Sequence, residues 1–209
     1  MRRFDRANPP AAWNQNEAKW NQQWVDLLKT NARATFSWYT HEGQTARDIA
    51  LPHLREQTGE HCSFCDGFPV DSVSMETIEH FRPKSDSRFR QHAYTWNNLY
   101  YCCDRCQSHK GEKWDDGLIA PDAHDYNFGR YFEFDFTTGA IRPSTTASDA
   151  EKHRAEITIS MYGLDTDKRR RFRRLELKKW SGSDPAGRHL DEFAYRNYLI
   201  QELPAPALV

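Results

Sequence analysis

Apolar residues near the start of the chain recur at helical spacing. Trp20, Trp24 and Leu27 lie three or four positions apart, which is the spacing of one face of an α-helix. Asn14 and Glu17 stand ahead of this stripe in the pattern of a capping box. The sequence therefore predicts an amphipathic helix of about 15 residues that begins near Asn14.

A second helix is expected from residue 46 to about residue 57. Gly59 follows it as a stop signal, and Pro52 indicates that the helix bends or divides. This helix would deliver the chain directly to Cys62.

The patterns in the rest of the chain alternate between strand and helix. Aromatic and β-branched residues in 75–83 and 93–101 predict a pair of antiparallel strands, and 103–113 fits a short helix that ends near Gly111. The alternation of aromatic and acidic residues in 131–143 predicts a β-hairpin that turns at Thr138 and Gly139. Three further helices are expected at 149–162, 166–180 and 189–202.

These elements indicate an α+β protein with three regions. We expect a helical N-terminal extension at 1–59, a central module with its following hairpin at 60–143, and a helical C-terminal region at 144–209. The chain has 209 residues, and neither its start nor any later stretch has the apolar run of a secretory signal or a membrane span. A cytoplasmic protein that does not enter a membrane is therefore expected.

The formal net charge is −1, but the charges are unevenly distributed. Residues 81–114 carry an excess of cations, and residues 168–179 hold eight Lys or Arg against one acid, Glu176. Such a cluster can attract a polyanion or an acidic protein, and it can also be an ordinary solvated helix face.

Four of the five cysteines form two C-x-x-C pairs, Cys62 with Cys65 and Cys103 with Cys106. Two such pairs can complete the tetrahedral shell of one structural zinc ion. Buried free thiols or a redox pair are the alternatives. Cys102 directly precedes Cys103, so a slipped second pair is also open, although the two-residue spacing favours Cys103.

Candidate chemistry lies between the cysteine pairs. His80 has a side chain suited to take a proton from water at neutral pH. Glu79 and Asn98 offer oxygen atoms for a divalent ion, Mg²⁺ or Mn²⁺, with Asn97 as a rival to Asn98. Cations for the phosphates of a nucleic acid would come from Arg82, Lys84, Arg105 and Lys110. The simpler interpretation is a core or surface histidine beside an incidental acid.

The order of these motifs resembles the HNH endonucleases, whose fold is ββα-metal. It runs from C-x-x-C through Glu-His-x-x-Pro-x-Ser and Trp-Asn-Asn-Leu to a second C-x-x-C with a lysine four residues on. The resemblance implies that His80 is the general base, that Glu79 and Asn98 hold the catalytic ion, and that Gln107 stands at the last motif position. His109 is a further candidate ligand.

Within that superfamily, the chain start and the segments 77–85, 95–111 and 119–122 resemble PtuB-like effectors of Septu and retron antiphage defence systems. This resemblance implies an ABC-type ATPase partner and, in a retron, a reverse transcriptase with its RNA-linked DNA. The chain itself has no G-x-x-x-x-G-K-[ST] nucleotide-binding loop. The substrate would be DNA or a structured RNA such as tRNA, with DNA favoured. A noncatalytic zinc module that binds nucleic acid or a protein is the alternative function.

Overall fold

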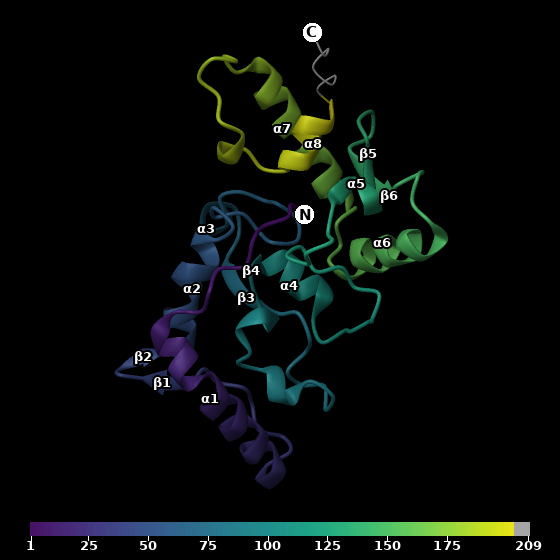
Figure 1. Ribbon diagram of the computed structural model, residues 1–209. Helices are drawn as coiled ribbons and strands as arrows, with labels where there is room; N and C mark the ends of the chain where they lie inside the picture. Colours follow the sequence, from purple (N-terminus) through teal and green to yellow (C-terminus); the bar gives the residue numbers. More distant parts are fainter. Residues whose placement is uncertain (203–209) are drawn as a thin grey trace.

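The computed structural model describes residues 1–202 and has an α+β architecture (Figure 1). Helix α1 and the β1–β2 hairpin lie at the bottom of Figure 1, strands β3 and β4 with helix α4 lie in the middle, and helices α7 and α8 lie at the top. The elements are α1 (Ala11–Thr30), β1 (Thr40–His41), β2 (Gln44–Thr45), α2 (Ala46–Glu56), α3 (Val70–Val73), β3 (Glu76–His80), β4 (Leu99–Cys103), α4 (Asp104–Lys110), α5 (Phe128–Tyr131), β5 (Phe132–Asp135), β6 (Ala140–Pro143), α6 (Asp149–Met161), α7 (Asp167–Gly182) and α8 (Arg196–Glu202), with 3-10 turns at Arg90–His92, Trp96–Asn98 and Leu190–Glu192.

Helix α1 starts earlier than the sequence predicts, so the capping box at Asn14 and Glu17 is wrong. Pro10 is the N-cap, and the backbone N–H of Asn14 already donates to the carbonyl of Pro10. The Glu17 carboxylate instead accepts a hydrogen bond of 3.1 Å from the backbone N–H of Trp96. Two of the three residues of the predicted apolar stripe, Trp20 and Trp24, are buried, whereas Leu27 is exposed.

Helix α2 confirms the prediction for residues 46–57. Helix α2 contains Pro52. Its N-cap is Thr45, whose side chain accepts a hydrogen bond from the N–H of Asp48, while the Asp48 carboxylate accepts one from the backbone N–H of Thr45. This capping box satisfies backbone donors that a helix end otherwise leaves without partners.

Strands β3 and β4 pair antiparallel and lead into α4. Glu76 lies opposite Cys103, and His80 lies opposite Leu99. Both strands are shorter than predicted, since β3 covers only 76–80 of 75–83. Strand β4 begins only at Leu99, because residues 93–98 form turns, one of them a 3-10 turn, rather than extended chain. Helix α4 ends as predicted at Gly111, which has a φ of 53°, in the left-handed region that favours glycine.

The C-terminal elements follow the prediction except at the end. Strands β5 and β6 form the expected hairpin, and α6 and α7 match the expected helices. Only residues 196–202 of the predicted helix 189–202 are α-helical. Tyr195 has a φ of 57°, and the N–H groups of Tyr195 and Arg196 donate to Asp66, the residue directly after the first cysteine pair. The α-helix begins only after this contact.

One main core runs from α1 to residue 164 and includes the cysteines and β4. A smaller cluster joins Trp180, Phe193, Tyr198 and Leu199 near the hairpin β5–β6. The three-region division of the chain stays a prediction, and residues 203–209 of its last region lie outside the described residues. Within residues 1–202, every helix is too short or too polar to cross a membrane.

Candidate metal centre and candidate active site

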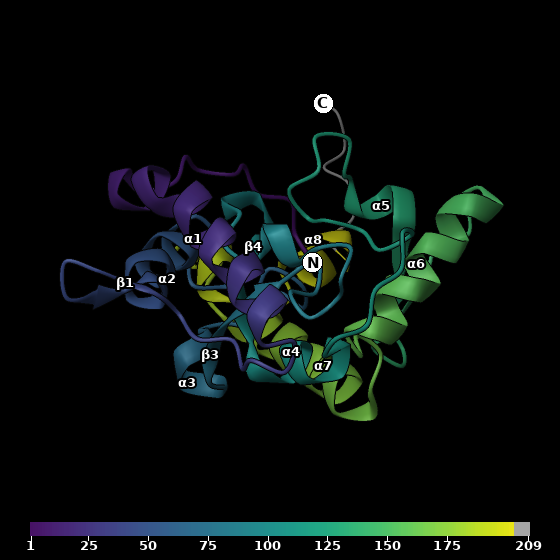
Figure 2. The same cartoon turned by 90° about the horizontal axis from the view of Figure 1, so that it is seen from below.

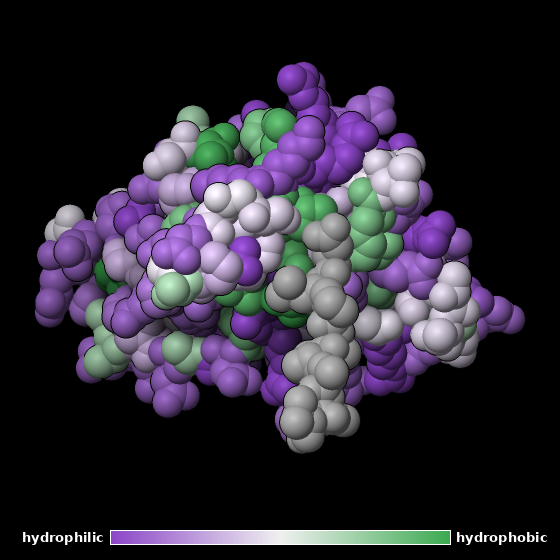
Figure 3. Space-filling model, turned by 90° about the horizontal axis from the view of Figure 1, so that it is seen from above, coloured by the Kyte–Doolittle hydropathy of each residue, from purple (hydrophilic) through white to green (hydrophobic). Residues whose placement is uncertain are grey.

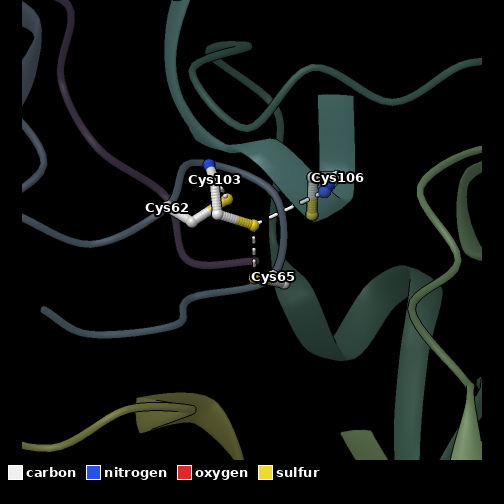
Figure 4. A group of neighbouring side chains, drawn as sticks. All are labelled: Cys62, Cys65, Cys103 and Cys106. Carbon is white, nitrogen blue, oxygen red and sulfur yellow. Dashed lines mark hydrogen bonds between the residues drawn. The ribbon is translucent and has the colours of Figure 1, made fainter. Parts of the chain in front are cut away.

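The four cysteines of the two C-x-x-C pairs converge on one point (Figure 4). Their sulfur atoms all lie within 4.8 Å of one another. In tetrahedral zinc with Zn–S bonds near 2.3 Å, sulfur atoms lie about 3.8 Å apart, and the Sγ atoms of Cys65 and Cys103 are separated by 3.7 Å. Cys106 comes from α4 and Cys103 from the end of β4. The donor set and its spacing fit a structural zinc ion.

Cys102 lies outside this quartet. Its thiol is buried and donates to the carbonyl of Cys103 at 3.2 Å. The ambiguity between Cys102 and Cys103 is therefore resolved in favour of Cys103. The Cys102 thiol nevertheless lies close to the side chains of Cys62, Cys103 and Cys106, so the choice of Cys103 rests on the convergence of the four sulfur atoms of the quartet.

The C-terminal region contacts this centre through an arginine that sequence reasoning missed. The buried guanidinium of Arg169 in α7 donates to Sγ of Cys106 at 3.1 Å. Buried Arg196 in α8 binds the Asp66 carboxylate with a shortest distance of 2.6 Å. Four thiolates around Zn²⁺ carry a net charge of −2, so a buried guanidinium offsets charge that would otherwise be costly to bury.

The last two residues of β3 line a separate cavity of about 230 Å³. Glu79 and His80 both lie on its wall, although neighbours within a strand normally point to opposite faces. His80 ends the strand, so the alternation no longer constrains the two side chains. The other residues of this cavity are Pro83, Lys84, Gln107, Gly111 and Glu112. The cavity is a candidate active site, and it is called the active-site pocket below.

The His80 ring is held in one orientation. Its Nε2 lies 2.8 Å from the carbonyl oxygen of Ala93, and Trp38 stacks on the ring with 5.5 Å between centroids. A carbonyl can only accept, so Nε2 carries the proton and Nδ1 keeps its lone pair. Burial, with the positive charge of Lys84 as a second cause, lowers the pKa of His80 well below its usual value. His80 is therefore neutral at pH 7.

Glu79 forms a buried ion pair with Lys110. Its Oε1 lies 2.7 Å from Nζ of Lys110, and the two side chains are 4% and 0% exposed. Lys110 also donates to the carbonyl of His80 at 2.9 Å. Burial raises the pKa of Glu79 to about 7, and the ammonium of Lys110 opposes that rise.

The Asn98 amide bonds to the loop between β3 and β4. Its Oδ1 accepts from the N–H of Arg82 at 2.7 Å, and its Nδ2 donates to the carbonyls of Arg82 and His92. Asn98 is not on the wall of the active-site pocket. The structure therefore places this side chain where it fixes the loop, and contact with an ion stays a prediction.

Two residues of α4 occupy different places. Gln107 lines the active-site pocket, and its Nε2 donates to the carbonyl of Ile78 at 2.9 Å. The exposed His109 lies against Gly163, where an added Cβ would be 2.6 Å from the imidazole Cγ. The structure does not bring His109 to Glu79.

The four cations expected to bind phosphate are also dispersed. Lys84 lines the active-site pocket, and exposed Arg82 begins the loop beside it. Arg105 lines a different cavity between α3, α4 and α7. Lys110 is fully buried, so its ammonium contacts the Glu79 carboxylate and the carbonyl of His80 instead of solvent.

The pocket offers oxygen donors of the kind that Mg²⁺ or Mn²⁺ binds. They are the Glu79 carboxylate, Oε1 of Gln107 and the Glu112 carboxylate. The donor types fit a hard divalent ion, but Lys110 already places one positive charge against Glu79. Sequence reasoning placed Gln107 at the motif position and assigned Lys110 to phosphate binding, whereas the structure pairs Lys110 with Glu79.

The comparisons with family models and with known proteins gave different results. No protein-family model matches the chain. A protein of Vibrio cholerae serotype O1 biovar El Tor, named "Retron Vc95 putative HNH endonuclease", is 27% identical over 143 residues, which covers 66% of this chain and 68% of that protein. This distant similarity supports the resemblance to HNH endonucleases.

Proposed function

We propose that the protein is an HNH endonuclease that hydrolyses phosphodiester bonds in a nucleic acid. The observation that carries the proposal is the state of His80. A backbone carbonyl fixes its tautomer, an aromatic ring fixes its plane, and its neutral ring lies on the wall of a polar pocket. A general base requires this combination of a free lone pair and a fixed direction.

In the proposed reaction, Nδ1 of His80 takes a proton from a water molecule. The water oxygen bonds to phosphorus, the bond from phosphorus to one ester oxygen breaks, and that oxygen leaves with the bonding electrons. Asn98 acts as a positioning residue, since its amide holds the loop that carries Ala93 and Arg82. A divalent ion bound at Glu79 and Gln107 would stabilise the negative charge on the leaving oxygen.

The cations around the pocket would hold the flanking phosphates. Lys84 and Arg82 are the nearest to His80 along the chain, and Arg105 extends the positive surface toward α7. Helix α7 presents exposed Lys168, Arg171, Arg174 and Lys178. Figure 3 looks down on the side of α7 and α8, where hydrophilic surface alternates with hydrophobic patches. This surface suits a polyanion.

The biological setting is part of the proposal. The name of the Vibrio cholerae protein places that relative in a retron, which supports a role for this chain as the nuclease effector of an antiphage defence system of the Septu or retron type. An ABC-type ATPase and a reverse transcriptase with its RNA-linked DNA are the proposed partners. DNA is the favoured substrate, and a structured RNA such as tRNA is the other candidate.

The test is a cleavage assay on the purified full chain with DNA and RNA substrates, in Mg²⁺ and in Mn²⁺, with and without the partner ATPase. We expect His80→Ala to abolish cleavage while zinc content stays at one ion per chain. The matched control is His109→Ala, an exposed histidine outside the pocket, which should cleave like the wild type. Equal cleavage by wild type and His80→Ala would remove His80 from the mechanism.

One observation favours the second candidate, a noncatalytic zinc module that binds nucleic acid or a protein. Lys110 neutralises Glu79, so a divalent ion must compete with an internal cation. Titration calorimetry with Mn²⁺ separates the two functions. The nuclease predicts a second site beyond zinc that Glu79→Gln removes, whereas the noncatalytic module predicts zinc binding alone.

A further inference from the structure

A groove of about 370 Å³ lies between α3, the start of α4 and α7, and it is called the α3–α7 groove. Figure 2 shows these three helices along one edge of the molecule. Cys65 and Cys103 of the metal centre are among the lining residues. No described residue lines both this groove and the active-site pocket, so the groove is a separate site.

Exposed apolar side chains gather at this groove. Within residues 1–202, six large apolar side chains are exposed, and four of them belong to the groove or adjoin it. Val73 and Phe172 line it, and Met75 and Leu175 each follow or precede a lining residue in the sequence. These four side chains are between 48% and 72% exposed. Apolar residues clustered in this way are typical of an interaction surface, whereas single scattered ones are not.

One face of α7 forms a long wall of the groove. Arg169, Phe172, Glu176 and Lys179 line it, at the three- and four-residue spacing of one helix face. Ten residues of α-helix extend about 15 Å, and α3 forms the opposite wall. A groove between two helices can take the apolar face of a third helix.

The charges beside the groove are mainly positive and unpaired. Arg105 lines the groove and is exposed, and Lys168, Arg171 and Lys178 are exposed on α7. In the part of the chain that the structure describes, none of these four side chains makes a hydrogen bond or an ion pair. Successive residues of a helix are about 100° apart, which places Lys168 and Leu175 next to the lining face of α7 and the other two cations beyond them.

The acids of the wall do not reverse this balance. Glu176 accepts a hydrogen bond of 3.1 Å from the N–H of Ala194, and its carboxylate lies 3.5 Å from Nζ of Lys179. The remaining acid of the wall is the exposed Glu192. The free charge around the groove is therefore four cations against one carboxylate.

We propose that the α3–α7 groove binds an acidic amphipathic helix of a partner protein. The apolar face of that helix would cover the four exposed apolar side chains, and its Asp or Glu residues would pair with the four free cations. A nucleic acid presents phosphates but no aliphatic side chain to cover Val73 and Met75. A second copy of this chain would bring the same positive charge to the contact, and like charges repel.

The inference goes beyond the proposed nuclease, because it concerns a different face of the molecule. Arg171 and Lys178 are also proposed to attract nucleic acid. The partner helix and a nucleic acid would therefore compete for α7.

The test selects peptides of about 16 residues, enough for four helical turns, from a random library on the full zinc-loaded chain. The enriched peptides should carry a net negative charge, with apolar residues at the i, i+3, i+4 and i+7 positions. Fluorescence anisotropy then measures their affinities for variants. Phe172→Ala should weaken binding about 3- to 10-fold, because about half of the ring becomes newly buried in the complex. Arg105→Gln should weaken it about 2- to 5-fold at low salt and less at high salt.

The matched control is Leu27→Ala, an exposed leucine on α1 at the other end of the molecule (Figure 1). It should leave peptide binding unchanged, and both alanine variants should keep their zinc and melt close to the wild type because the replaced side chains are exposed. Enrichment of no peptide, enriched peptides without net negative charge, or equal affinity for wild type and Phe172→Ala would each overturn the inference.

Two further results would overturn it by assigning the groove to another occupant. Dimers that Phe172→Ala abolishes, seen by sedimentation, would indicate a second copy. Binding of a single-stranded oligonucleotide that Phe172→Ala weakens, with no peptide enriched, would indicate a nucleic acid. A chain that enriches acidic amphipathic peptides but cleaves nothing would keep the groove and refute the nuclease.

Discussion

Lys110→Met tests the buried ion pair at the candidate active site. The substitution keeps a long apolar side chain but leaves Glu79 without its cation. Both partners are almost fully buried. Breaking such a pair by removing one partner costs about 3–5 kcal/mol when the remaining partner stays ionised.

The loss of stability should depend on pH, because the pKa of Glu79 is about 7. At pH 5.5 the Glu79 carboxyl is largely protonated whether or not Lys110 is present. Lys110→Met then loses only side-chain packing and the hydrogen bond from Lys110 to the carbonyl of His80. Above pH 7 the wild type ionises, whereas the pKa of Glu79 rises further in the variant. The penalty should then grow by about 1.4 kcal/mol for each pH unit, up to the new pKa.

Urea unfolding of zinc-loaded protein at pH 5.5 and pH 8 measures this difference. The control Lys113→Met removes an exposed lysine three residues away and should change stability little at either pH. The double variant Glu79→Gln with Lys110→Met should recover most of the stability at pH 8. An equal penalty at both pH values, or a double variant as unstable as Lys110→Met, would refute the reasoning.

The buried carboxyl, the metal centre and the basic helix each give one further prediction. Folding raises the pKa of Glu79 from about 4.5 to about 7, so the native state binds a proton that the unfolded state has lost in this pH range. The free energy of unfolding of the wild type should therefore fall by about 3 kcal/mol between pH 4.5 and 7, relative to Glu79→Gln. Urea-unfolding profiles with the same pH dependence for both proteins would contradict this. Removal of zinc by a chelator should unfold the central strands, seen as loss of amide-exchange protection, and protection that survives would contradict a structural metal. The triple variant Arg171→Gln, Arg174→Gln and Lys178→Gln tests the basic helix. The slope of log K for duplex DNA binding against log salt concentration should become less steep by about 0.9 for each phosphate that the variant no longer neutralises. An unchanged slope would exclude α7 from the interface.

The sequence predicted the cysteine cluster and most of the longer helices, because local signals determine both. The two C-x-x-C spacings identify the ligands without tertiary information. Gly111 locates the C-terminal end of α4, and Trp20 and Trp24 locate the buried face of α1. The capping box at Asn14 failed because Pro10 opens the helix one turn earlier.

The contacts around His80 were beyond sequence reasoning, because they join distant segments. Phe36 and Trp38 reach the imidazole from the connection after α1. The burial of Lys110 depends on how α4 packs on β3. The sequence could not predict it, because an exposed lysine that binds phosphate at a helix end has the same sequence pattern. Asn98 likewise looks like an ion ligand in sequence, whereas its amide holds a loop in the structure.

The central claim is that the imidazole of His80 takes the proton from the attacking water. Chemical rescue tests it most directly. His80→Gly should lose cleavage, and added imidazole should restore it in a saturable way, with a pH dependence that follows the added base. Full activity in His80→Gly without imidazole would contradict the claim, as would failure of every imidazole or substituted imidazole to restore a folded, zinc-loaded variant.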